Sequence, residues 1–356
     1  MSEEAFERLP VSVLTGFLGS GKTTLLRHLL RQPGFADTAV VINEFGEIGL
    51  DHLLVESASE DMLLLSSGCL CCTIRGDLIA TLRRLYKSRA KGEIPGFARV
   101  VIETTGLADP APILHTLMQD PMLCDVYRLD GVIATVDAVN GMDQLDRQVE
   151  SVKQAAVADR IVLTKTDLNE DAALLKTRLR RLNPAAALLS AIDGRIEPAG
   201  LFGAGLYDPS NKSLEVQHWL REEAYRPGAA HHDDRHDHDH AARDPNRHDD
   251  RIRAFCLRHE APLDWARFVD WIEMLIALRG ANLLRIKGIL NLAGSDRPVA
   301  VHGVQHLFHP PVELPAWPDE DHASRLVFIT RDIEEATLAK GLRAFQAGGP
   351  DGYNPA

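Results

Sequence analysis

Long apolar runs are absent from this sequence of 356 residues. No stretch approaches the ~20 consecutive apolar residues that a helix needs to cross a bilayer. Residues 1–8 are acidic and lack the apolar core of a signal peptide. We therefore expect a cytoplasmic protein with no membrane partner.

Positive charge is scarce as well. The chain carries 39 Lys and Arg against 51 Asp and Glu, a formal net charge of −12, and no basic block offsets this excess of acid. Nucleic-acid binding depends on a basic surface, so we expect no nucleic-acid partner. The hydrophobic content of 45% is ordinary for a globular protein. The length exceeds one typical core, which favours two domains.

Cysteine is rare, and its few copies are unevenly spread. The chain has five, at Cys69, Cys71, Cys72, Cys124 and Cys256. Disulfides are uncommon in a reducing cytoplasm, so we expect these side chains to bind metal or to lie buried.

One glycine-rich stretch is the most informative part of the chain. It follows a short apolar run at 11–14 and precedes a helical apolar pattern at 25–30. Its pattern, G-x-x-x-x-G-K-[ST], lets backbone N–H groups surround an anion at a helix N-terminus. Lys22 can reach the β- and γ-phosphates, and the Thr23 hydroxyl can bind Mg²⁺. We predict a nucleotide site made by Gly16, Gly19, Ser20, Gly21, Lys22, Thr23 and Thr24.

Short apolar runs alternate with helical patterns over the first two hundred residues. The predicted strands lie at 38–43, 99–106, 131–137, 160–167 and 186–190, a further short apolar run lies at 62–65, and one predicted helix spans 77–89. Strands that alternate with helices form right-handed βαβ units, with a parallel sheet covered on both faces.

The composition changes sharply at residues 231–251, which are almost entirely His, Asp and Arg. Such a stretch cannot bury a core, so we expect a disordered linker. Its histidines (231, 232, 236, 238, 240 and 248) either bind divalent metal loosely or belong to a solvated acidic tether. Beyond it, strands are predicted at 252–259, 283–292, 299–307 and 325–330, with helices at 263–278 and 334–345. The first helix should bury Trp265, Val269, Ile272 and Ile276.

An acid at the end of the strand predicted at 99–106 adds to the phosphate chemistry. In P-loop enzymes such an acid orders Mg²⁺, here Glu103, and a nearby glycine N–H, here that of Gly106, meets the γ-phosphate. The alternative is a carboxylate that caps the next turn. We therefore predict Lys22, Thr23, Glu103 and Gly106 as catalytic residues, with Thr23 and Glu103 on Mg²⁺. Leu107 stands where a water-orienting glutamine would help, so hydrolysis should be slow.

The strand predicted at 160–167 ends in Thr164, Lys165, Thr166 and Asp167. The Asp167 carboxylate can accept from the guanine N1–H and exocyclic amine, a donor pair that adenine lacks. The Lys165 stem can lie over the base. Thr164 stands where such motifs usually have Asn, and the alternative is a surface turn. We predict that Thr164, Lys165 and Asp167 bind guanine.

The cluster of Cys69, Cys71 and Cys72 is the most distinctive feature. Consecutive residues of a strand face opposite ways, so three converging thiolates require a turning backbone, which Gly68 allows. Three cysteines without a nearby fourth ligand differ from a closed structural zinc site. They indicate an open site that takes a further ligand, with Glu47 and the histidines as candidates. The alternative is three buried cysteines in a core.

Taken in order, these motifs resemble the CobW family of metallochaperone GTPases, which is grouped with the nickel-inserting GTPases of hydrogenase and urease maturation. The resemblance rests on residues 16–24, 43–47, 68–72, 103–106 and 164–167. It implies an α/β fold, with a P-loop GTPase domain on a mostly parallel sheet over 1–205. The His/Asp-rich linker would span 206–250, and a small α+β C-terminal domain 251–356.

The resemblance further implies that GTP and Mg²⁺ control Zn²⁺ or Co²⁺ held at the cysteines, for delivery to a client metalloprotein. The cysteines lie between the phosphate loop and Glu103. In GTPases that interval holds segments ordered by the γ-phosphate, so metal and GTP affinities should be linked. A P-loop small-molecule kinase and a metal store with incidental nucleotide binding remain alternatives. The oligomeric state stays open, with a homodimer among the options.

Overall fold

The computed structural model describes residues 8–35, 37–42, 55–59, 62–65, 70–73, 77–169, 172–203 and 251–348, with backbone only over 55–59, 62–65 and 70–73. Glu47, Cys69 and the predicted linker lie outside these residues. The chain divides into two compact units, each built around its own sheet.

The N-terminal sheet contains nine strands among the described residues, in the order β3-β4-β5-β2-β6-β1-β7-β8-β9. From β5 to β9 in this order neighbouring strands are parallel, whereas β4 is antiparallel to both of its neighbours, β3 and β5. The strands are β1 Leu9–Gly16, β2 Thr38–Ile42, β3 Val55–Ser59, β4 Met62–Leu65, β5 Leu70–Thr73, β6 Arg99–Glu103, β7 Tyr127–Asp137, β8 Arg160–Thr164 and β9 Ala187–Ala191. The mostly parallel sheet confirms the predicted fold class.

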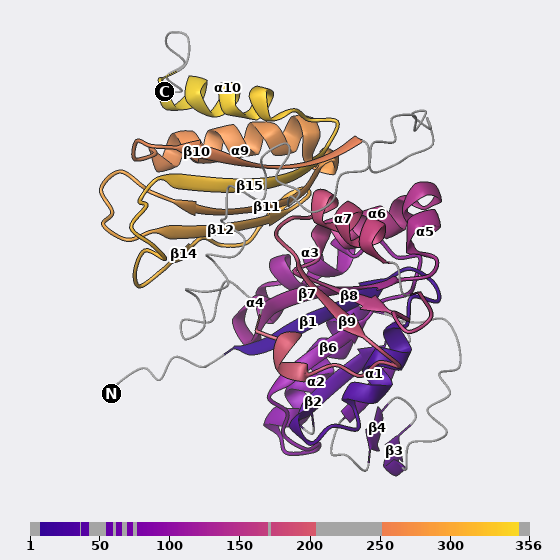
Figure 1. The fold of residues 1–356 in the computed structure, drawn as a ribbon. Helices are drawn as coiled ribbons and strands as arrows, with labels where there is room; N and C mark the ends of the chain where they lie inside the picture. Colours follow the sequence, from indigo (N-terminus) through magenta and orange to yellow (C-terminus); the bar gives the residue numbers. More distant parts are fainter. Residues whose placement is uncertain are drawn as a thin grey trace. The chain divides into compact units, whose positions relative to one another are not determined.

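Helices cover this sheet, as the buried strand sequences require (Figure 1). Leu25, Leu26 and Leu29 of α1 pack on Val40 and Val101 of the central strands. The helices of this part are α1 Lys22–Leu29, α2 Leu78–Ala90, α3 Ala111–Gln119, α4 Pro121–Val126, α5 Gly141–Arg147, α6 Val149–Val157 and α7 Ala173–Leu182.

The short apolar run at 62–65 forms β4, whose partners β3 and β5 were not predicted. The backbone of Cys71 and Cys72 is extended within β5 and pairs with Val40 and Val41 of β2. The prediction of a turning backbone was therefore wrong at these two residues. Pairing with β2 extends this stretch, a long-range effect that its own residues do not reveal.

The C-terminal sheet is antiparallel, with the strand order β10-β15-β11-β12-β13 and β14 paired to β12. Both helices described here pack against one face of it (Figure 1). This unit confirms the predicted α+β class. Its elements are β10 Ile252–His259, α9 Trp265–Arg279, β11 Leu283–Leu290, β12 Val299–Val304, β13 Leu307–Phe308, β14 Val312–Glu313, β15 Ser324–Arg331 and α10 Glu335–Gln346.

The buried face of α9 differs from the predicted one. Ile272 is buried as predicted, but Trp265 is exposed, and the helix buries Phe268, Trp271 and Leu275 beside Ile272. The sequence offers two overlapping apolar stripes, and the sheet selects the one in which Trp271 meets Phe328, with ring centroids 6.1 Å apart. In the part of the chain that is described, no helix is long and apolar enough to span a bilayer.

Candidate nucleotide and metal site

The residues predicted to bind the nucleotide lie where the parallel strands end. In an open α/β sheet, ligands bind outside the carboxyl ends of the strands. β1 ends at Gly16, β6 at Glu103, β7 at Asp137 and β8 at Thr164. The strand order places these four ends on neighbouring strands.

The glycine-rich loop turns at positive φ. Gly16 has φ +141°, and a Cβ there would lie only 2.3 Å from Thr135 Oγ1 of β7. Gly19 also has positive φ (+72°), with no atom within 4 Å of a Cβ built on it. The loop therefore touches the sheet at its start and is open at Gly19, as a loop that holds a ligand requires.

Hydroxyl groups hold this loop on the sheet. Ser20 Oγ and Thr135 Oγ1 lie 2.6 Å apart, within hydrogen-bonding distance. Thr164 Oγ1 donates to the Ser20 carbonyl at 2.7 Å. Thr164 therefore uses the hydroxyl that Asn would lack to join the loop after β8 to the phosphate loop. Ser20 thus faces the sheet, so its contribution to a nucleotide site is through its backbone.

Positive charge concentrates at the start of α1. The helix begins at Lys22, has no acidic residue in its first turn and exposes Thr24 there. The Lys22 Nζ donates to the carbonyls of Gly16 and Phe17 at 2.9 and 3.2 Å. A buried ammonium at a helix N-terminus favours an anion. These residues fit the phosphates of a nucleotide.

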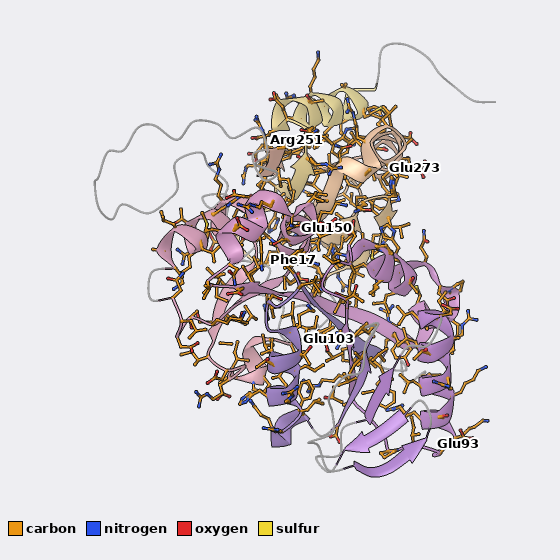
Figure 2. All side chains as sticks on the ribbon, turned by 90° about the vertical axis from the view of Figure 1, so that its right-hand side faces the viewer. Phe17, Glu93, Glu103, Glu150, Arg251 and Glu273 are labelled. Carbon is orange, nitrogen blue, oxygen red and sulfur yellow. The ribbon has the colours of Figure 1, made fainter. Side chains whose placement is uncertain are left out.

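Thr23 and Glu103 meet directly. The Thr23 hydroxyl donates to Glu103 Oε1 at 2.8 Å, and Glu103 is fully buried at 0% exposure. A buried carboxylate next to a hydroxyl and a phosphate loop has the hard oxygen donors that Mg²⁺ prefers. Figure 2 labels Phe17 and Glu103 within the body of this domain, and Glu93 at its margin.

Gly106 lies directly against the phosphate loop. A Cβ on Gly106 would come within 2.7 Å of the Leu18 backbone nitrogen, so only glycine allows this approach. The loop after β6 is further fixed by Thr104, whose N–H donates to the Leu14 carbonyl at 2.9 Å. This contact suits the predicted meeting of Gly106 with a terminal phosphate.

The loop after β8 is tied to β7 through Asp137. Lys165, at φ +56°, donates from Nζ to Asp137 Oδ2 at 2.7 Å. Burial alone would raise the pKa of Asp137, but hydrogen bonds from Lys165, Asn140 and the Val139 N–H hold it below its ordinary value. Asn169 also donates to the Ala138 carbonyl at 2.7 Å, while Asp167 is exposed.

Sequence reasoning missed Asp137 as a site residue. A signal was present, because the apolar run predicted as a strand at 131–137 ends in this acid, just as another ends in Glu103. The structure brings together the predicted residues 16–24, Glu103, Gly106, Thr164 and Lys165 along one edge.

The predicted metal ligands are only partly described. Cys71 and Cys72 are described as backbone, whereas Cys69 and Glu47 lie outside the described residues. Among the described side chains, no group of three or more His, Cys, Asp or Glu could hold a metal ion. The register nevertheless places this strand near Glu103, which is predicted to bind Mg²⁺. Ile42 of β2 pairs with Thr73 on one side and with Glu103 on the other.

Comparison with known proteins extends over both domains. The CobW/HypB/UreG nucleotide-binding domain matches residues 10–190, and the cobalamin synthesis protein cobW C-terminal domain matches residues 252–346. The zinc chaperone YjiA of Escherichia coli (strain K12) is 34% identical over 333 residues, which are 93% of this chain and 96% of that protein. The zinc chaperone CobW of Sinorhizobium sp is 27% identical over 369 residues, 95% of this chain and 97% of that protein.

Solved structures agree. The crystal structure of the Zn(II)-bound YjiA GTPase from E. coli matches with a TM-score of 0.72 at 32% identity, covering 95% of this chain and 99% of that one. A Zn(II)-bound triple mutant of that GTPase, with one glutamate and two cysteines changed to alanine, matches with a TM-score of 0.73 at 31% identity, covering 96% and 99%. With both family domains present in order and the P-loop GTPase fold built as its motifs require, this chain belongs to the CobW/HypB/UreG family of GTPases.

Proposed function

We propose that this protein is a GTP-dependent zinc metallochaperone. It hydrolyses GTP slowly, binds Zn²⁺ as cargo at Cys69, Cys71 and Cys72, and releases the ion to a client metalloprotein. GTP hydrolysis and the metal site belong to residues 1–205, linked through 206–250 to the C-terminal domain at 251–356. Co²⁺ is the alternative cargo, since thiolates suit both ions.

The nucleotide half rests on the edge of the parallel sheet. Lys22 and the first turn of α1 supply positive charge for phosphates. Thr23 and Glu103 offer oxygen ligands that would hold Mg²⁺, and the ion would supply positive charge that stabilises the charge developing on the phosphates. Leu107 cannot orient water, so turnover should be about 10⁻⁴ to 10⁻² per second, as in GTPases without outside help.

The metal half rests on the cysteines and on relatives that are named zinc chaperones. Thiolates are favourable Zn²⁺ ligands, and an open fourth position suits an ion that must leave again. Consecutive residues of a strand face opposite ways, so the proposal requires the extended backbone at Cys71 and Cys72 to turn when the ion binds. Glu47 or solvent would occupy that position.

The observation that carries the proposal is the pairing of Ile42. Thr73, next to Cys72, and Glu103 are paired to the same residue from opposite sides. Strands lie about 4.8 Å apart, so the backbones of these two residues are separated by roughly 10 Å. A shift of Glu103 or of its Mg²⁺ would therefore act close to the cysteine strand, which supports linkage between nucleotide and metal.

The test is Zn²⁺ affinity, measured by competition with a chelator, in the absence of nucleotide, with GDP and with a non-hydrolysable GTP analogue. We expect the analogue with Mg²⁺ to change the affinity by about 5- to 150-fold. The double variant Cys71→Ser, Cys72→Ser should lose the tight site but keep nucleotide binding. The matched control Cys124→Ser, Cys256→Ser changes the two cysteines outside the motif and should behave as wild type.

Affinity, rather than zinc content, is the deciding quantity. The triple mutant of the YjiA GTPase, with two cysteines replaced, is still Zn(II)-bound in its crystal, so zinc content alone does not identify a site at the cysteines. Unchanged tight binding in the cysteine variant would contradict the metal assignment. If Zn²⁺ binds tightly with the same affinity in all three nucleotide states, a metal store is favoured. If the protein turns over ATP rapidly and in preference to GTP, a kinase is favoured.

A further inference from the structure

The loop that follows Glu103 is supported from behind by a buried glutamine of α6. Gln154 is 1% exposed, and its Nε2 donates to the carbonyls of Ala108 and Gly106 at 2.9 and 3.2 Å. Both partners are acceptors, so the side-chain nitrogen, and not the oxygen, must face the loop. One amide group thus uses both of its N–H bonds on the same short loop.

These contacts are the ones that fix the Gln154 side chain. Among the described residues, no donor reaches its Oε1, although that atom is buried. A buried amide normally satisfies its oxygen as well as its nitrogen. The orientation of Gln154 therefore depends on the loop carbonyls, and the loop in turn depends on Gln154.

The support is anchored on both sides. The neighbouring Lys153 forms an ion pair with Asp109 at 2.8 Å, at the far end of the same loop. Beyond α6, Asp159 Oδ2 accepts the Val132 N–H of β7 at 2.9 Å, which ties the end of the helix to the sheet. The loop is thus held against a fixed part of the domain, and not against a mobile surface.

The contact between Gln154 and the Gly106 carbonyl lies next to the proposed γ-phosphate position. Gly106 is the residue proposed to meet the γ-phosphate, and its approach to Leu18 leaves no room for a Cβ. Holding the Gly106 carbonyl fixes the peptide that follows this N–H. We propose that Gln154 is a positioning residue for the loop of residues 104–109, here called the γ-phosphate loop. By holding this loop in place, Gln154 would let the enzyme favour GTP over GDP. The inference rests on the GTPase function proposed above.

The test compares Gln154→Met, which keeps the length but cannot donate, with wild type. We expect affinity for a non-hydrolysable GTP analogue and kcat for GTP to fall about tenfold, as expected when two hydrogen bonds are lost. GDP affinity should stay within about twofold, because GDP lacks the γ-phosphate. Gln154→Glu places an oxygen against the same carbonyls, so its affinity for the GTP analogue and its kcat should fall at least as far. Amide hydrogen exchange over 104–109 should become faster in both variants.

The matched control is Gln32→Met, since Gln32 Nε2 also donates to a loop carbonyl, that of Ile196 at 3.2 Å. It should leave the ratio of GTP-analogue to GDP affinity unchanged. An equal loss of both affinities in the Gln154 variants, or a lower melting temperature with normal kcat, would show that Gln154 only supports the fold. A wild-type protein that hydrolyses no GTP would instead overturn the proposed function, and this inference with it.

Discussion

The Thr23 hydroxyl donates to Glu103 Oε1 at 2.8 Å, although the two residues are 80 positions apart in the sequence. This bond joins the first turn of α1 to the end of β6. It brings together the two oxygen donors that the proposed Mg²⁺ site needs.

Glu103→Gln keeps an oxygen that can accept from Thr23 but removes the negative charge. We expect the Mg²⁺ concentration needed for half-maximal hydrolysis to rise, and kcat to fall on the order of 10²-fold, as when one preorganised electrostatic contact is lost. The measurement is GTP hydrolysis against Mg²⁺ concentration. The control is Glu93→Gln, at the margin of the domain in Figure 2, and an unchanged Mg²⁺ dependence of the Glu103 variant would refute the assignment.

Asp167→Asn should change the choice of base. The carboxylate that accepts from two guanine donors becomes an amide, which can instead donate to the C2 carbonyl of xanthine. We expect GTP affinity to fall by about 10- to 150-fold, the loss typical of a hydrogen bond to a charged group, while xanthosine triphosphate affinity rises. Asp193→Asn, an exposed acid in the loop after β9, should alter neither. If both variants bind GTP like wild type, the guanine assignment fails.

Asp137 should make stability depend on acid. Its pKa is held below the ordinary value in the folded state, since the bonds from Lys165, Asn140 and the backbone outweigh burial. The stability that it contributes is fully present above the unfolded pKa of about 3.9 and is lost as the pH falls through the lower folded value. Urea unfolding should be measured near neutral pH and below about pH 4. Between these two pH values the free energy of unfolding should fall more for wild type than for Asp137→Asn. Equal losses would mean that the ion pair with Lys165 does not stabilise the fold.

Phe328→Ala tests whether the two sheets support separate functions. Phe328 is buried between Phe255 and Trp271, with centroid distances of 5.8 and 6.1 Å, and its loss should cost about 3–5 kcal/mol of unfolding free energy. Nucleotide affinity should be unchanged, because the proposed contacts lie in residues 16–24, 103–106 and 164–167. Calorimetry would measure the loss of unfolding free energy, and GDP titration would measure the nucleotide affinity. The counterpart Phe35→Ala, in the core of the N-terminal domain, should weaken nucleotide binding as well.

Local pattern was enough for much of this protein. The glycine-rich loop, Glu103 and the residues around Thr164 could be predicted from the sequence because each depends on residues close together in the chain. Apolar periodicity likewise predicted the α/β class and most central strands, since buried parallel strands are apolar throughout. The family resemblance follows from the same short motifs.

Only the tertiary structure decided the contacts between these motifs. Ser20 meets Thr135 across 115 positions, and Thr164 reaches the Ser20 carbonyl across 144. The placement of Gln154 behind Gly106, and of Cys72 in a strand beside β2, depends on how distant segments pair. Periodicity shows which residues are apolar, but strand order decides which loop ends become neighbours. In this protein that order sets the loop after Glu103 against α6 and brings the cysteine strand within two strands of Glu103.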